Sequence, residues 1–127
     1  MEPSRRRRHL PAAILALLIL AASLVPVPES AGDRVPTLFG LALDKWVHAV
    51  GYAALTGVLA WARNPRTAGP AVALTVAVVA YGGGIELLQG LLSSRGTSGA
   101  DFVANTTGAL LACVAWLVVR RHLGQAD

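Results

Sequence analysis

The stretch FVANTTGALLACVAWLVV, residues 102–119, contains no lysine, arginine, aspartate or glutamate. Residues 10–28, 46–62 and 67–85 share this property. A helix of roughly 17–25 apolar residues crosses about 30 Å of hydrocarbon, where the backbone has to satisfy its own hydrogen bonds. The sequence therefore predicts an all-α integral membrane protein with four transmembrane helices. We expect one membrane domain over residues 1–127, with spans at about 10–28, 45–62, 68–90 and 101–119.

The composition excludes several classes of protein. Apolar residue types make up 54% of the chain and charged types 14%, whereas soluble domains average about 25% charged residues. A disordered chain and a water-soluble globule are therefore both excluded, and 127 residues are too few for a multidomain cofactor enzyme. The single cysteine, Cys113, allows no internal disulfide and no cysteine-based metal site.

The basic residues predict the orientation of the helices. The net charge of +4 is not gathered into a nucleic-acid-binding patch, so we expect no nucleic-acid partner. Eight cations fall on one side of the four predicted spans and three on the other. Cytoplasmic loops are the ones enriched in lysine and arginine, so both termini are expected in the cytoplasm, in a multi-pass protein of the cell membrane. The eight cations are Arg5, Arg6, Arg7, Arg8, Arg63, Arg66, Arg120 and Arg121, and the three are Arg34, Lys45 and Arg95.

The first apolar stretch has a second interpretation. A basic N-terminus, an apolar core and the residues Ala21-Ala22-Ser23 resemble a cleaved signal peptide. The apolar run is long for such a signal and three more spans follow it, which favours a retained first helix; both alternatives stay open. Residues 37–43, which are apolar and precede the second span, are expected to form a short amphipathic segment or a lid at the outer surface.

Polar side chains concentrate near the outer ends of the last three spans. Asp44, His48 and Tyr52 follow one another at four-residue spacing and share one helical face. Ionisable groups are costly near lipid, so these groups are expected to face the interior of the bundle and to pair. Because short links make the three helices antiparallel neighbours, the groups converge at one depth and predict an outward-facing polar pocket. The candidate ligand-binding residues are Asp44, Lys45, His48, Tyr52, Glu86, Gln89, Arg95, Asp101 and Asn105.

Several of these residues also have a structural interpretation. Asp44 and Lys45 could anchor a helix at the membrane interface, and Asp101 could interact with the dipole of its helix. His48 could be a hydrogen-bonded core histidine, and Asn105 could hold two helices together.

Glu86 is the carboxylate that most needs a partner. It ends an apolar run and follows Gly82-Gly83-Gly84. A carboxylate at this position is expected to pair with Arg95, Lys45 or His48. The glycines are expected either to admit a close approach by another backbone or to kink the helix, and both outcomes would shape a cavity beside the polar cluster.

The polar residues also form a recognisable spaced pattern. Asp44-Lys45-x-x-His48-x-x-x-Tyr52, Glu86-x-x-Gln89 and Arg95-x-x-Ser98-x-x-Asp101-x-x-x-Asn105-x-x-Gly108 resemble the motif of the VanZ-like family of small membrane proteins. The resemblance covers residues 44–111 and, with the first helix, most of the chain. It implies a four-helix fold and, for the founding member, an association with teicoplanin, a glycopeptide antibiotic that acts outside the membrane. It implies no reaction.

Three functions are compatible with these residues. The favoured one is not enzymatic: the pocket binds the head group of a membrane lipid, a lipid-linked envelope precursor or a glycopeptide, with Lys45 and Arg95 contacting an anionic group. In the second, a membrane enzyme acts on a lipid head group, with His48 as base oriented by Asp44, and Glu86 as acid. In the third, the cluster clamps helices within a larger membrane complex. We expect no metal and no cofactor, and a homo-oligomer stays open.

Overall fold

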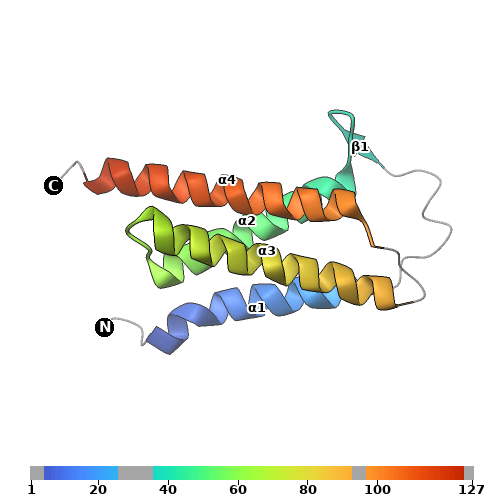
Figure 1. The fold of residues 1–127 in the computed structure, drawn as a ribbon, viewed down its shortest axis with the longest axis horizontal. Helices are drawn as coiled ribbons and strands as arrows, with labels where there is room; N and C mark the ends of the chain where they lie inside the picture. The colour runs from blue at the N-terminus through green and yellow to red at the C-terminus, as the bar shows by residue number, and fades with distance from the viewer. Residues whose placement is uncertain (1–4, 26–35, 93–96, 125–127) are drawn as a thin grey trace.

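Four helices make up most of the described chain. The computed structural model describes residues 5–25, 36–92 and 97–124. Figure 1 shows the helices packed along one another, and each described helix contacts at least two others. The described elements are α1 (Arg5–Leu24), β1 (Thr37–Leu38), β2 (Leu41–Ala42), α2 (Leu43–Arg63), α3 (Ala68–Leu91) and α4 (Gly99–Gly124). The all-α prediction is confirmed for this part of the chain.

Three of the helices are long and apolar enough to cross a membrane. These are α1 from Arg7 to Leu24, α3 and α4. Their outer surfaces expose large apolar side chains, including Leu17 on α1, Val76 on α3 and Leu111 on α4. Soluble monomers rarely expose contiguous apolar surface of this kind. The chain is therefore a membrane protein by the length, composition and surface of these helices.

Helix α2 is the described helix without a stretch that meets the length and hydropathy of a membrane span, and its first three turns carry polar side chains. It contacts all three other helices, so these side chains have protein neighbours. At its far end, Asn64 adopts the left-handed conformation with φ 50° and its N–H donates to the Ala60 carbonyl. This ends the helix and turns the chain into α3. Trp116 of α4 donates its indole N–H to the Pro65 carbonyl and ties this turn to α4.

Two glycines bring the helices close to α2. A Cβ built on Gly108 of α4 would lie 2.7 Å from the carbonyl carbon of Ala49 and 2.9 Å from its Cα. A Cβ on Gly82 of α3 would lie 2.8 Å from the ring of Tyr52. At the glycine triplet the close neighbour is therefore an aromatic ring, and the expected approach by another backbone is found at Gly108 instead. Helix α3 continues without interruption through residues 82–84.

Helix α1 is attached to the bundle by apolar packing and by two polar side chains of α3. Leu15, Ala16 and Ile19 pack against the buried core around Tyr52. Tyr81 donates its hydroxyl to the Ala16 carbonyl at 2.5 Å, and Gln89 donates its amide to the Ser23 carbonyl at 2.8 Å. The helix ends at Leu24 rather than at the expected residue 28, because a residue that precedes proline disfavours the helical conformation.

The apolar segment before α2 is a β-hairpin, which the sequence did not predict. Thr37 pairs with Ala42 and Leu38 with Leu41 in an antiparallel register. Phe39 and Gly40 form the turn with φ of 52° and 76°, a combination typical of tight hairpins. Trp46 donates its indole N–H to the Leu38 carbonyl and meets the Phe39 ring edge-on at 6.5 Å. Figure 1 shows the hairpin extending sideways from the bundle.

Candidate functional site

The predicted polar residues gather at one end of the bundle. Figure 1 shows the start of α2, the end of α3 and the start of α4 at the same end. Eight of the nine candidates lie in the described residues, and Arg95 lies outside them. We use the name "polar cluster" for six residues at this end whose contacts are described below. They are Asp44, Lys45, His48, Glu86, Asp101 and Asn105.

Lys45 joins α2 to α4 by ionic contacts. Its Nζ lies 2.5 Å from Asp44 Oδ2 and also donates to Asp101 Oδ1. The side chains of Lys45 and Asp101 are 18% exposed, whereas that of Asp44 is 48% exposed. The hydrogen bond from Lys45 lowers the pKa of Asp44 below its ordinary value; partial burial opposes this effect and the ammonium charge reinforces it. In the described chain the ammonium group is thus already neutralised by two carboxylates.

His48 connects the same two helices one turn deeper. Its Nδ1 lies 2.9 Å from Asn105 Oδ1, and Asn105 is only 2% exposed. With the Asn105 oxygen as acceptor, Nδ1 is the donor, so Nε2 of a neutral ring carries the lone pair. That Nε2 lies 3.9 Å from Asp101 Oδ2. The second ring nitrogen of His48 therefore faces a carboxylate of α4.

Glu86 is buried at the end of α3, next to the start of α4. It is 7% exposed, and its Oε2 accepts the Ser98 backbone N–H at 3.1 Å. Its other oxygen, Oε1, is buried and has no hydrogen-bond partner among the described residues. Of the partners expected from the sequence, Lys45 contacts Asp44 and Asp101, and His48 contacts Asn105.

Ser98 is a residue of this site that the candidate set omitted. Its backbone N–H donates to Glu86, and its hydroxyl accepts the Asp101 backbone N–H at 3.2 Å. A serine before a helix with an acid three residues later is a helix-capping signal, so the sequence did contain the information. Ser98 thus fixes both the start of α4 and the position of the Glu86 carboxylate.

Tyr52 and Gln89 have mainly packing roles among the described residues. Tyr52 is 2% exposed and fills the space beside Gly82. Gln89 is 4% exposed and holds the end of α1 through the Ser23 carbonyl. Together with His48, Tyr52 lines a cavity of about 240 Å³ between α1 and α2.

A larger hollow lies between α3 and α4 and reaches the polar cluster. This groove has a volume of about 820 Å³ and is lined by apolar side chains, glycines, two hydroxyl residues (Thr97 and Ser98) and one carboxylate. Glu86 and Ser98 stand at one end of it, and Val76 at the other. We call this hollow the α3–α4 groove.

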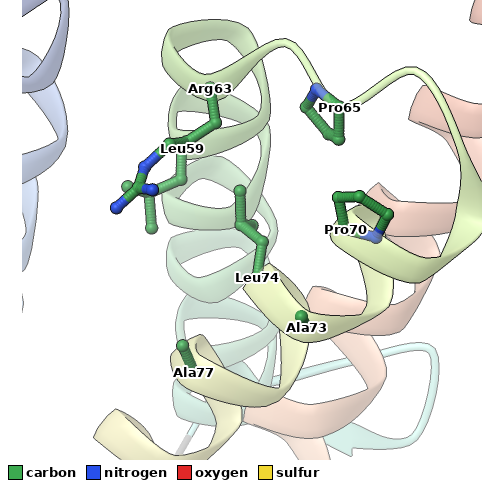
Figure 2. Close-up of a pocket in the computed structure, with 7 residues that line it drawn as sticks. All are labelled: Leu59, Arg63, Pro65, Pro70, Ala73, Leu74 and Ala77. Carbon is green, nitrogen blue, oxygen red and sulfur yellow. The ribbon is translucent and has the colours of Figure 1, made fainter.

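The opposite end of the bundle has a cavity of different character. It has a volume of about 490 Å³ and lies between α2 and α3 beside the Pro65 turn. Figure 2 shows Pro65, Pro70 and Leu74 around it, while the Arg63 guanidinium extends away from the two prolines. Arg63 is the only ionisable side chain that lines it within the described chain, so it lacks the convergent polar groups of the other end.

Comparison of the chain with protein-family models, curated proteins and solved structures found no match. The described residues contain no group of three or more histidine, cysteine, aspartate or glutamate side chains placed to hold a metal ion.

Proposed function

We propose that this chain is a VanZ-like, four-span membrane protein whose polar cluster forms an outward-facing pocket for the polar head group of a lipid, a lipid-linked envelope precursor or a glycopeptide. One observation carries this proposal. Ionisable side chains stand at the same end of three helices, where Lys45 crosses from α2 to Asp101 of α4 and Glu86 of α3 accepts the N–H of Ser98 at the start of α4. Intramembrane ionisable groups are expensive and mark functional sites by default.

Helix α2 supplies the fourth span in this arrangement. Its 21 residues correspond to about 31 Å at the helical rise, enough to cross the hydrocarbon layer. Lys45, His48 and Tyr52 of α2 have protein neighbours, while Asp44 lies half exposed in its first turn. Arg63, Arg66, Arg120 and Arg121 lie at the end opposite the polar cluster, and the excess of cations there supports cytoplasmic termini in the cell membrane.

The pocket offers mainly hydrogen-bond acceptors. The Lys45 ammonium is engaged by two carboxylates, so it is less able to capture an anion than the sequence suggested. Asp44 remains half exposed, and the Nε2 atom of His48 presents a lone pair. Hydroxyl and amine groups, which are donors, would satisfy these acceptors. Lipid and sugar head groups carry both.

The test is to identify what the protein retains when it is purified in a mild detergent. Native mass spectrometry of the wild-type chain should show a bound lipid or lipid-linked sugar. Asp101→Asn and His48→Ala should lose it while keeping wild-type helix content by circular dichroism. Trp61→Phe, an exposed residue outside the cluster, is the matched control and should retain the ligand.

The same experiment separates binding from a purely structural clamp. A clamp predicts that Asp101→Asn and His48→Ala lower the yield and the thermal midpoint without changing the retained lipids. If all four proteins carry the same lipids in the same amounts, the binding proposal is wrong and the cluster serves to hold α2 against α4.

An enzymatic function is the second candidate, favoured by the geometry of His48. Its Nδ1 is oriented by Asn105 while Nε2 faces the Asp101 carboxylate at 3.9 Å, an arrangement suited to proton transfer. The test is turnover of a labelled form of the retained lipid. Product that appears with the wild-type chain and is abolished in His48→Gln would support catalysis, and its absence with the wild-type chain would contradict it.

A further inference from the structure

The α3–α4 groove has the form of a binding site for one lipid chain. On α3 its wall runs from Val76 to Leu87, about 16 Å at the helical rise of 1.5 Å per residue. This is about half of the roughly 30 Å hydrocarbon core, close to the depth of one leaflet. Both helices that form it are apolar enough to span a membrane, so the groove is open to lipid along its length.

The polar end of the groove holds an incompletely bonded carboxylate. Glu86 is 93% buried, and one of its oxygens accepts the Ser98 N–H while Oε1 has no partner within the described ranges. Ser98 also lines the groove, so the carboxylate lies where the end of α3 meets the start of α4. Rotation about the last side-chain bond of a glutamate is broad, which lets either oxygen turn toward a ligand. A buried carboxylate oxygen without a partner is costly in a membrane, and a donor in the groove would remove that cost.

The charge of the polar cluster selects a cationic donor. Asp44, Glu86 and Asp101 bring three formal negative charges and Lys45 one positive charge, a sum of −2. Counting Arg95, which lies outside the described residues, would leave −1. An ammonium group supplies three N–H donors together with the missing positive charge, whereas a neutral hydroxyl supplies only the hydrogen bond.

We propose that the α3–α4 groove binds a phospholipid with a primary-amine head group, with one acyl chain along α3 and the ammonium group on the Glu86 carboxylate. This inference rests on the proposed function and gives its ligand a chemical class. The phosphate of the lipid remains at the membrane surface beyond the end of α3.

Lipid titrations followed by native mass spectrometry of the full-length chain test the head group. The probes are phosphatidylethanolamine, phosphatidylcholine and phosphatidylglycerol with identical acyl chains. Phosphatidylcholine keeps the positive charge but has no N–H donor, and phosphatidylglycerol has no amine. The wild-type protein should bind phosphatidylethanolamine about tenfold more tightly than either, as expected for a charge-assisted hydrogen bond. Glu86→Gln should abolish this preference, so that the three lipids bind with about equal affinity.

A pair of glycine variants tests the groove independently of the charge. Gly84 lines the groove, and a Cβ built on it meets no atom within 4 Å. Gly84→Phe should therefore fill the groove without disturbing the fold. The affinity of the protein for all three lipids should fall. Gly57 on α2 has equally open space and lines none of the cavities described above, so Gly57→Phe is the matched control and should bind lipids as the wild type does.

Three results would overturn the inference: equal affinity of the wild type for phosphatidylethanolamine and phosphatidylcholine, an unchanged preference in Glu86→Gln, or equal effects of Gly84→Phe and Gly57→Phe. If the preference for the amine is absent but Asp101→Asn still releases a retained ligand, this inference fails and the proposed function stands. If the wild type retains no specific ligand, both fail.

Discussion

Gly108 of α4 lies against the backbone of Ala49 on α2, where any Cβ on Gly108 would stand 2.7 Å from the Ala49 carbonyl carbon. The contact is backbone to backbone, so no flexible side chain can move aside. Gly108→Ala should therefore separate α2 from α4 and lower the free energy of unfolding by about 1–3 kcal/mol, the usual range for overpacking. Thermal unfolding in detergent, followed by circular dichroism, measures this loss.

Gly57→Ala is the matched substitution for Gly108→Ala. A Cβ on Gly57 meets nothing within 4 Å, and alanine is a better helix former by about 0.5–1 kcal/mol. This variant should match or exceed the wild-type midpoint. If both alanine variants had the same midpoint, the close packing of α4 on α2 would not be a source of stability.

The two carboxylates that contact Lys45 should differ in their contribution to stability. Asp101 is 18% exposed and Asp44 is 48% exposed. Asp101→Asn should lower the free energy of unfolding by about 1.5–3 kcal/mol, as for a hydrogen bond to a charged group. Asp44→Asn should cost less than about 1 kcal/mol, as for a surface ion pair.

The ion pair itself can be isolated by a double-mutant cycle. Once Lys45→Met has removed the ammonium group, Asp101→Asn should cost less stability, because the Asp101 carboxylate has already lost its ionic contact with Lys45. The double variant should therefore be more stable than the sum of the two single changes indicates. Additive effects would show that Asp101 acts through its capping position on α4 rather than through Lys45.

Acid should weaken the folded protein partly through Asp44. The hydrogen bond from Lys45 depresses the pKa of this group in the folded state. A carboxyl group with a depressed folded pKa adds stability above its unfolded pKa, about 3.9, and this stability is lost as the pH falls through the lower folded value. The wild type should therefore be more stable than Asp44→Asn near neutral pH. The difference between their midpoints should shrink below about pH 4, and a difference that is constant with pH would contradict the assignment.

The turn of the hairpin should prefer residues that tolerate a left-handed conformation. Phe39 has φ of 52° and is 91% exposed. Phe39→Asn and Phe39→Val both remove the ring contact with Trp46, but asparagine tolerates this conformation and a β-branched residue does not. The asparagine variant should therefore be more stable than the valine variant by about 1 kcal/mol. Equal midpoints would indicate that the hairpin opens independently of the helix bundle.

The sequence predicted the helices and the convergence of polar groups, because both follow from periodicity and from short links. It could not predict which carboxylate Lys45 contacts, since that depends on how α2 and α4 are rotated about their axes. It missed the hairpin because the Phe39-Gly40 turn lacks the usual asparagine or aspartate signal. The capping role of Ser98 could be predicted from its spacing to Asp101. Its hydrogen bond to Glu86 could not, because that contact depends on how α3 and α4 pack.

The position of α2 has a consequence for how this protein is made. It is the described helix without a stretch that meets the length and hydropathy of a membrane span, and it contacts all three others. An insertion machinery that selects segments by hydropathy favours α1, α3 and α4 over α2. In the four-span arrangement proposed here, α2 would become stable in the bilayer only when α3 and α4 are available to cover its polar face. Biogenesis would then be cooperative, with α2 the last helix to reach its final position.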